Sequence, residues 1–496
     1  MNYYSKSKFV LFHSCKKRLW LEKYKQEEKE EILNQNVLIQ GNRVGDLAMN
    51  LFGDYYLAET PENDLATQVQ NTKQAIENKE NVICEAAFFF ENNYCAVDIL
   101  KRNADDSYSV YEVKSTTKVE PHYLYDLGYQ YYVLHNLGIN IKELYLVHIN
   151  SSYVLKNELD INNYFTIENL TDDVKSKYDE VKDMLAESDE ILNSEFEIKS
   201  ILSANCNKNG GCPFLAYCKK NNGLPLINST YDLYNNRSKY KQIDSGLLSF
   251  EDLLNSNSKL SDIQRRQIEF AILDKSEVYL EKSNIKEFLN KFKFPLYFLD
   301  FETFQEAIPT IIGTKPYQQV PFQYSLHILD ENGDLEHKEY LGDGINNPIE
   351  GLIINMISDL KDSGTIVSYN DSFERARIKE MAYMYPKYSR KLKELDTRFV
   401  DLADVFQMGY CYNKAMGGSF SIKSVLPALF PNDPTLDYHN LSDVHKGDEA
   451  SSTYLELAKL DKEAYDRKRK SLLAYCKLDT FAMVKIYFKL LELIGE

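Results

Sequence analysis

The stretch Pro295-Leu-Tyr-Phe-Leu-Asp300-Phe-Glu302-Thr-Phe304 predicts a buried strand that ends in two carboxylates. Its aromatic and branched residues run without a charge until Asp300. Because side chains alternate across a strand, Asp300 and Glu302 point to the same face. Neighbouring buried carboxylates repel each other and lose hydration, so a compensating cation is expected. We interpret the pair as an Mg²⁺ or Mn²⁺ site rather than as solvated acids on an edge strand.

The chain is long enough for two or three domains. Its 496 residues are 44% hydrophobic and 27% charged, with a net charge of −17. That charge argues against wholesale electrostatic capture of nucleic acid, but a local basic groove remains open because binding depends on where Lys and Arg cluster. No apolar run approaches the ~18 residues of a membrane span, and the N-terminus lacks an apolar signal core. We therefore expect a cytoplasmic protein without a membrane partner.

Three of the eight cysteines form a close cluster, Cys206, Cys212 and Cys218. A cytosolic chain is not expected to build a disulfide framework, so this cluster indicates metal binding. Zinc would need a fourth thiolate or imidazole. A 4Fe-4S cluster needs four thiolates, and the fourth would be Cys15. We favour the iron–sulfur cluster and keep Zn²⁺ as the alternative.

A strand-rich block carries the second set of acids. Residues 82–90 and 94–100 predict a hairpin, 108–115 a third strand, 123–137 a helix and 144–149 a fourth strand. Asp98 lies in the hairpin, while Glu112 and Lys114 share one face of the next strand. The acids can hold Mg²⁺, and the lysine can position or deprotonate an attacking water. The alternative is that Glu112 and Lys114 form only an exposed ion pair.

This arrangement resembles the PD-(D/E)XK nuclease core of the RecB type, which is found in helicase–nucleases and CRISPR-associated exonucleases. The resemblance implies that Asp98 and Glu112 bind metal and that Lys114 is the catalytic lysine. Glu85 stands where an additional acid often assists, and Gln130 corresponds to the glutamine that the family carries on the helix after the lysine.

Two further features bear on that resemblance. Family members usually carry a metal-binding histidine in the preceding helix, where this chain has Gly45. One early cysteine with three more after the nuclease core resembles the clasp of iron–sulfur RecB-type nucleases, which implies a structural cluster. Basic residues beside these cysteines could contact phosphates or form a solvated face: Lys16, Lys17, Arg18, Lys219 and Lys220.

Two more motifs follow the acid pair along the chain. Asn370-x-x-Phe373-Glu374 opens a predicted helix, and Tyr475-x-x-x-Asp479 lies on the last helix, where the two side chains share a face. In this order the motifs resemble the DEDDy 3′–5′ exonuclease superfamily of the RNase H fold.

That resemblance implies four acids that hold two divalent ions, and a tyrosine that orients the attacking water. The acids are Asp300, Glu302, Glu374 and Asp479, and the tyrosine is Tyr475. Glu374 replaces the aspartate of the family's second motif, and Asp371 is the alternative ligand.

We therefore predict an α/β protein. A PD-(D/E)XK restriction-endonuclease-like domain with a cysteine cluster (1–225) is joined by a helical connector (226–290) to an RNase H-like exonuclease domain (291–496). This combination resembles a family of uncharacterised bacterial proteins. The predicted activity is metal-dependent hydrolysis of phosphodiester bonds, as an exonuclease on DNA with single-stranded ends, in repair or defence and with a helicase as a further partner. The alternatives are an RNA-processing 3′–5′ exonuclease and a non-catalytic nucleic-acid-binding protein.

Overall fold

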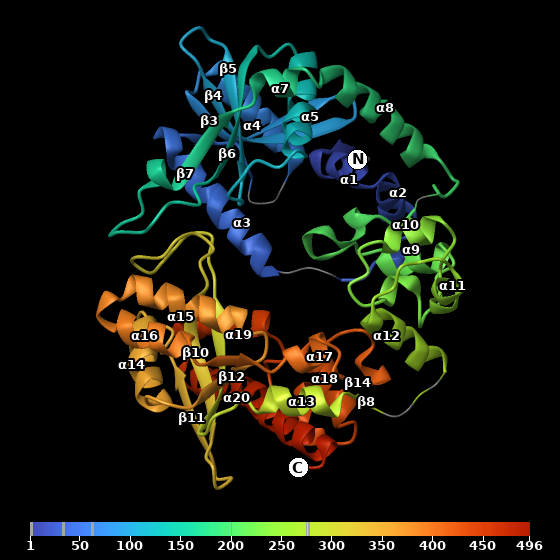
Figure 1. Ribbon diagram of the computed structural model, residues 1–496. Coiled ribbons are helices and arrows are strands. Elements are labelled where there is room, and N and C mark those ends of the chain that lie inside the picture. Colours follow the sequence, from blue (N-terminus) through green and yellow to red (C-terminus); the bar gives the residue numbers. More distant parts are fainter. Residues whose placement is uncertain (1–2, 32–34, 61–63, 200, 274, 276–277) are drawn as a thin grey trace. The chain divides into compact units, whose positions relative to one another are not determined.

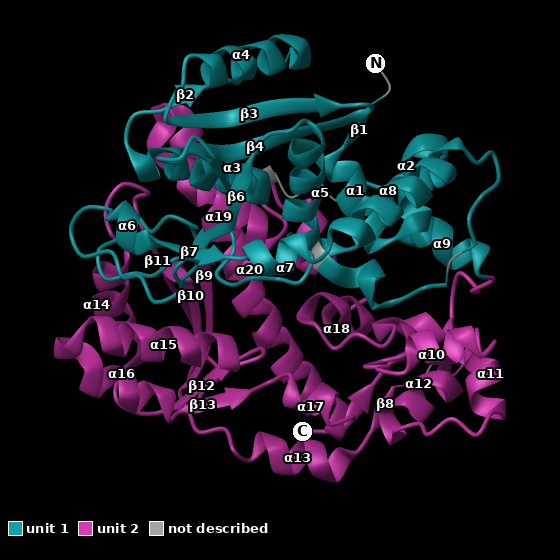
Figure 2. Cartoon of the chain, turned by 90° about the horizontal axis from the view of Figure 1, so that it is seen from above, with its two compact units in different colours: residues 1–222, 306–318 teal, residues 223–305, 319–496 magenta. Residues whose placement is uncertain are grey.

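The chain folds as two compact units (Figure 2). The first comprises Met1–Asn222 with Glu306–Gln318, and the second comprises Gly223–Gln305 with Gln319–Glu496. The computed structural model describes residues 3–31, 35–60, 64–199, 201–273, 275 and 278–496. The stretch expected to be a connector, 226–290, lies within the second unit, and the segment 306–318 belongs to the first.

The first unit is built on a seven-stranded sheet with the order β2-β3-β4-β5-β6-β7, to which β1 adds by pairing with β4. Its strands are β1 (Tyr4–Ser5), β2 (Tyr56–Leu57), β3 (Val82–Phe90), β4 (Asn93–Arg102), β5 (Tyr108–Lys114), β6 (Ile141–Ile149) and β7 (Phe165–Asn169). Strands β3, β4 and β5 are antiparallel neighbours, whereas β5 and β6 are parallel. A parallel pair needs a crossover, and helix α5 (Tyr123–Asn136) supplies it.

Helices cover both faces of this sheet (Figure 1). On one face Leu127 and Val133 of α5 share a core with Val110 of β5. On the other face Val44 shares a core with Ile99 of β4. The helices of the first unit are α1 (Lys6–Ser14), α2 (Lys16–Tyr24), α3 (Gln35–Ala48), α4 (Leu65–Glu77), α5, α6 (Ile161–Tyr164), α7 (Thr171–Lys175), α8 (Tyr178–Asn193) and α9 (Leu215–Asn221). Because side chains alternate along β5, residues 112 and 114 face α5 with Val110.

The second unit is built on a five-stranded sheet with the order β11-β10-β9-β12-β13. Its strands are β9 (Leu296–Phe304), β10 (Val320–Leu329), β11 (Leu335–Leu341), β12 (Thr365–Ser368) and β13 (Phe399–Asp401). The central strand β9 is antiparallel to β10 and parallel to β12. A separate two-stranded ribbon joins β8 (Tyr279–Leu280) and β14 (Cys411–Tyr412). The strand predicted at 295–304 is therefore β9.

Two helices lie against opposite faces of β10. Tyr324 donates a 2.5 Å hydrogen bond to Asp359 of α14, while Gln323 donates a 2.9 Å bond to the carbonyl of Leu472 in α20. Since Gln323 pairs with Glu302 in the register, the acids of β9 face α20. The helices of the second unit are α10 (Lys239–Asp244), α11 (Phe250–Asn255), α12 (Asp262–Ile272), α13 (Lys282–Leu289), α14 (Ile349–Leu360), α15 (Ser372–Met384), α16 (Ser389–Asp396), α17 (Asp404–Gln407), α18 (Ile422–Leu429), α19 (Gly447–Glu456) and α20 (Lys462–Ile494).

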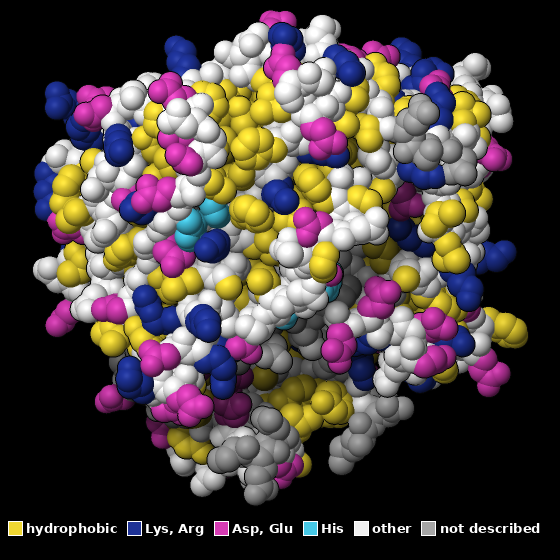
Figure 3. Space-filling view, turned by 90° about the horizontal axis from the view of Figure 1, so that it is seen from below, with side chains coloured by type: hydrophobic (Ala, Val, Ile, Leu, Met, Phe, Trp, Pro, Cys, Tyr) yellow, Lys and Arg dark blue, Asp and Glu magenta, His cyan; other side chains and the backbone are white. Residues whose placement is uncertain are grey.

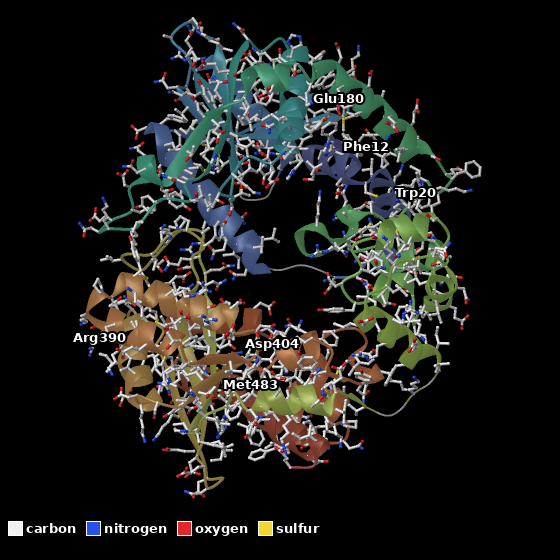
Figure 4. The ribbon with its side chains drawn as sticks, in the orientation of Figure 1. Phe12, Trp20, Glu180, Arg390, Asp404 and Met483 are labelled. Carbon is white, nitrogen blue, oxygen red and sulfur yellow. The ribbon has the colours of Figure 1, made fainter. Side chains whose placement is uncertain are left out.

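The α/β class expected from the sequence is confirmed, because each unit packs helices against a sheet of mixed strand direction. Buried side chains on the helices hold these layers together, for example Phe12 on α1 and Met483 on α20 (Figure 4). Among the described helices, none is both long and apolar enough to cross a membrane.

Candidate active sites

The second unit gathers four acids against the middle of its sheet. Asp300 and Glu302 come from β9, Glu374 from the first turn of α15 and Asp479 from α20. The last three are at most 8% exposed, with Glu374 at 3%. One carboxylate oxygen each from Asp300 and Glu302 and the sulfur of Cys476 all lie within 4.8 Å of one another. The acids that the sequence placed on one strand face therefore lie in a buried group.

Burial raises the pKa of each of the four acids, and neighbouring carboxylates add to this rise for Asp300, Glu302 and Glu374. Burial raises the pKa of Asp300 well above its usual range, and the carboxylates of Asp479 and Glu374 raise it further. Burial and Asp479 do the same for Glu302. Burial also raises the pKa of Asp479 to about 6 and that of Glu374 to about 8. Lys423 lowers the pKa of Glu302 and Arg377 lowers that of Glu374, but burial outweighs both effects and the two pKa values stay raised.

Glu374, rather than Asp371, is the second-motif acid that acts on this group. The carboxylate of Glu374 raises the pKa of Asp300, and its Oε2 atom is buried without a hydrogen-bond partner in the described part of the chain. Asp371 instead pairs with Arg375 at 3.4 Å, and Arg375 also contacts Asp396 at 2.9 Å.

Two residues that no motif pointed to complete the second unit's site. The hydroxyl of Tyr438 donates a 2.6 Å hydrogen bond to Oδ1 of Asp479. Lys423 donates a 3.3 Å bond to the hydroxyl of Tyr475, and it lies 5.0 Å from the centre of the Tyr438 ring. Only the fold could identify them, because neither stretch of sequence carries a motif for this chemistry. The backbone of Gly447, at the start of α19, also approaches the site: a Cβ there would lie 3.7 Å from Oε2 of Glu302.

In the first unit the central acid is Glu112, which is 1% exposed and fully hydrogen-bonded. Its Oε1 accepts from Lys6 at 2.8 Å and from Lys114 at 2.7 Å. Its Oε2 accepts from Lys6 at 3.0 Å and from Gln130 at 2.7 Å. Burial opposes the charge of Glu112, but the two lysines overcome it and lower the pKa to about 2. Gln130 therefore acts as a positioning group for the acid.

The other predicted residues of the first unit surround Glu112. Asp98 accepts a 2.6 Å hydrogen bond from the backbone N–H of Val113, and burial followed by the charge of Glu112 raises its pKa to about 6. Burial and Asp98 raise the pKa of Glu85 to about 8, and Glu85 has a φ of +54° within β3. A positive φ at a residue other than glycine, as at Glu85, is a strained backbone that is typical of functional positions. Lys114 also pairs with Asp126 at 2.6 Å.

Lys6 is the residue of this site that sequence analysis missed. It is the first residue of α1, far from the strands in sequence, and β1 places it there by pairing with the start of β4. Its pKa is raised, since Glu112 and Asp98 outweigh the effect of burial. The two units therefore differ in how their acids are neutralised. In the first unit, Lys6 and Lys114 already pair with the central acid, Glu112.

The four predicted cluster cysteines belong to neighbouring segments of the first unit. Cys15 lies between α1 and α2, and Cys206, Cys212 and Cys218 run from the 3₁₀ helix η3 (Ala204–Gly210) into α9. Burial raises the pKa of Cys218 to about 12, and the other three thiols contribute, so all four lie near one another. The backbone also closes this group, with a 2.8 Å bond from the Cys212 N–H to the Cys206 carbonyl.

The basic residues beside Cys15 are engaged within the first unit. Lys17 is 4% exposed and pairs with Glu197 at 2.7 Å. Lys16 pairs with Glu187, and Arg18 lies 3.9 Å from Glu22. Acidic and basic side chains also intermingle over the face of the molecule in Figure 3.

Comparison with known proteins gives one family match, which falls on the second unit. Residues 297–421 match a domain of unknown function, DUF2779. That range includes β9 and α15 with their three acids, and it ends before α20. The match covers about a quarter of the chain, so it describes one part of the protein.

Three curated relatives are similar over less than half of the chain. An uncharacterized protein of Mycoplasma genitalium is 30% identical over 237 residues, which are 43% of this chain and 34% of that protein. One from Mycoplasma pneumoniae is 30% identical over 225 residues, 41% and 33% of the two chains. One from Ureaplasma parvum is 28% identical over 226 residues, 42% and 32%. The chain spans about a third of the length of these relatives, and their descriptions name no activity.

Proposed function

We propose that the protein is a metal-dependent nuclease, an exonuclease that acts on DNA with single-stranded ends. The observation that carries this proposal is the group of four acids in the second unit. Burial raises the pKa of each acid, and repulsion from the other acids of the group adds to this rise for Asp300 and Glu302. Such a group is costly unless divalent cations neutralise it. Apart from one thiol, the donors are carboxylate oxygens. Carboxylate oxygens are the ligands that Mg²⁺ and Mn²⁺ prefer.

The residues of the second unit fit distinct parts of this reaction. Divalent ions held by Asp300, Glu302, Glu374 and Asp479 would activate the attacking water and stabilise the leaving oxygen. Tyr475 would orient the water from α20, one turn before Asp479. Tyr438 holds Oδ1 of Asp479 in place through its 2.6 Å hydrogen bond. Lys423 is close enough to Tyr475 to fix its hydroxyl and to attract a phosphate.

Support for an RNase H-like second domain comes from the sheet. Strand β9 lies between the antiparallel β10 and the parallel β12, and the acids sit on its α20 face. The three motifs thus meet on one side of one sheet, in the order in which the DEDDy resemblance expects them.

We propose the first unit as a second nuclease centre of the PD-(D/E)XK type. The order of an α-helix, three antiparallel strands, a crossover helix and a parallel strand supports it. Asp98 and Glu112 would hold the metal, with Glu85 as the accessory acid. Lys114, which pairs with Glu112 and Asp126, would act on the attacking water. In this centre a metal ion must compete with the ammonium of Lys6 for Glu112.

We propose that the four cysteines hold a 4Fe-4S cluster that braces the first unit. A cluster of this kind takes four thiolates, and the thiols of Cys15, Cys206 and Cys212 all act on Cys218. A single zinc ion held by the same four thiolates is the alternative. The indole N–H of Trp20 (Figure 4) donates a 2.9 Å bond to the Ser194 carbonyl, which holds α2 and therefore Cys15 in place.

The proposal is tested by digesting matched, end-labelled DNA and RNA with Mg²⁺ or Mn²⁺. Wild type, Asp300→Asn and Lys114→Ala are compared, because each variant disables one proposed centre. We expect metal-dependent release of nucleotides from single-stranded DNA and a loss of at least 100-fold with Asp300→Asn. Preferential digestion of RNA would favour the RNA-processing alternative. If neither variant changes turnover, the proposal is wrong.

A further inference from the structure

Cys476 is the one described thiol that shares a site with the second unit's acids. It is fully buried and follows Tyr475 on α20. Its sulfur lies 3.7 Å from Oδ2 of Asp300 and within 4.8 Å of a carboxylate oxygen of Glu302. Mg²⁺ chemistry gives no role to a sulfur atom at this position, because Mg²⁺ takes oxygen ligands.

We propose that this site binds Zn²⁺ through the Asp300 carboxylate, the Glu302 carboxylate and the Cys476 thiolate. The inference shares its acids with the proposed function, and it rests on that function only for its effect on activity. Bound zinc would displace the ions that support hydrolysis, so zinc would inhibit the enzyme.

The geometry of the three donors suits a tetrahedral zinc ion. Zn–O and Zn–S lengths of about 2.0 Å and 2.3 Å, at a tetrahedral angle, require an oxygen-to-sulfur separation of about 3.5 Å. The 3.7 Å between the Cys476 sulfur and Oδ2 of Asp300 needs little adjustment. Three protein ligands leave a fourth position for water or a phosphate oxygen.

A second observation points independently to a cation at this place. The Oε2 atom of Glu374 is buried, without a hydrogen-bond partner in the described part of the chain, and its residue is 3% exposed. Its carboxylate is close enough to act on both Asp300 and Glu302. An unsatisfied buried carboxylate oxygen is costly, and a bound cation would remove that cost.

The thiol distinguishes between metals. With Mg²⁺ the thiol stays protonated and the oxygens alone bind. With Zn²⁺ the S–H proton leaves to solvent as the Zn–S bond forms, and no change of oxidation state is involved. Cys411 is the matched comparison, because it is equally buried in the same unit and burial is the sole cause of its raised pKa.

The test uses Cd²⁺ as a spectroscopic substitute for Zn²⁺, with the full-length protein. Thiolate-to-cadmium charge transfer absorbs in the ultraviolet and counts the bound thiolates. The four cluster cysteines add the same absorption to the spectrum of every variant. The measurement is therefore the difference in absorption between wild type, Cys476→Ser and Cys411→Ser. We expect the absorption of one thiolate to be missing in Cys476→Ser, present in Cys411→Ser and weakened by Asp300→Asn. We also expect at least tenfold weaker Zn²⁺ binding at this site in Cys476→Ser. A Cys476→Ser spectrum identical to that of wild type would overturn the inference.

Two controls separate this inference from the proposed function. Circular dichroism checks the fold of Cys476→Ser, and Cys476→Ala replaces it if the serine variant does not fold. In the nuclease assay with Mg²⁺, Cys476→Ser should need at least tenfold more Zn²⁺ for half inhibition than wild type. A protein that shows the Cys476-dependent cadmium signal but no nuclease activity would refute the proposed function and leave the zinc site standing. An active nuclease whose zinc inhibition does not depend on Cys476 would refute the zinc site alone.

Discussion

The ammonium nitrogen of Lys6 lies 2.8 Å from Oε1 and 3.0 Å from Oε2 of Glu112, so this carboxylate is neutralised by the protein itself. Among the residues that the structure describes, no cation forms an ion pair with Asp300, Glu302, Glu374 or Asp479 in the second unit, and the pKa of Asp300 is raised well above its usual range. A divalent ion therefore gains more by binding in the second unit than in the first. The second unit is the centre on which the proposed activity depends most.

Replacing Lys6 should destabilise the protein in a way that metal reverses. Lys6→Met leaves Glu112, which is 1% exposed, with less positive charge around it. With EDTA present, we expect the free energy of unfolding to fall by about 2–4 kcal/mol, because breaking a buried ion pair leaves a charge uncompensated. Mn²⁺ should restore part of this loss, as thermal unfolding with and without metal will measure. Lys8→Met is the control, since Lys8 donates to the Tyr3 carbonyl instead. Equal stability of Lys6→Met and wild type would contradict the assigned role of Lys6.

Gly45→His should strengthen metal binding in the first unit. The RecB-type resemblance places a metal-binding histidine at this point, and a Cβ at Gly45 would meet no atom within 4 Å. We expect about tenfold tighter Mn²⁺ binding, measured by electron paramagnetic resonance in an Asp300→Asn background that weakens the other centre. Ile39→His controls for the substitution itself, because Ile39 is exposed on the same helix and lies about 120° around its axis from Gly45. If both variants bind Mn²⁺ equally, position 45 does not face the metal.

The stability of the metal-free protein should decrease as the pH rises. The pKa of Glu374 is raised from 4.5 to about 8, chiefly by burial, so the folded state holds a proton that the unfolded state releases between these values. The free energy of unfolding should therefore fall from about pH 4.5 to about pH 8, by an amount on the order of 2–4 kcal/mol. Urea unfolding in EDTA at several pH values will measure it. Other buried acids with raised pKa values contribute to the same slope, so Glu374→Gln should reduce the dependence without abolishing it, and by more than Asp371→Asn does. An unchanged slope in Glu374→Gln would exclude this assignment.

Tyr438→Phe should make Asp479 harder to ionise. Burial raises the pKa of Asp479 to about 6, and the hydrogen bond from Tyr438 opposes that rise. Without it, the acidic limb of the pH–rate profile should shift upward, and kcat/KM near neutral pH should fall by about tenfold. Tyr324→Phe removes a similar tyrosine–aspartate bond on the opposite face of the same sheet. A profile of Tyr438→Phe that matches that of Tyr324→Phe would show that the hydrogen bond to Asp479 has no special role.

The parts of the fold with strong local signals could be predicted from the sequence. The apolar run before Asp300 predicts β9, because a buried strand needs continuous apolar residues. Lys17 is a correction to the sequence analysis, which expected it to contact phosphates or to lie on a solvated face. It shares one face of α2 with Trp20 and Leu21, and all three are buried. Its side chain therefore lies against the unit's interior and pairs with Glu197.

The parts that depend on packing could not be predicted. Whether Glu374 reaches the other acids depends on how α15 lies against the sheet, which its own sequence does not encode. Lys6 and Tyr438 join their sites from segments without a motif. The segment 306–318 likewise joins the first unit through contacts such as the 2.6 Å bond from Tyr317 to the Ser115 carbonyl, next to the proposed catalytic lysine.

The central claim is that the four acids of the second unit hold the ions that hydrolyse nucleic acid. The most direct test is an Mg²⁺ titration of the hydrolysis rate on end-labelled single-stranded DNA, with wild type, Asp479→Asn and the control Asp371→Asn. We predict saturable, metal-dependent hydrolysis by wild type and Asp371→Asn, and a rate at least 100-fold lower in Asp479→Asn at every Mg²⁺ concentration. Equal rates for Asp479→Asn and wild type would contradict the account.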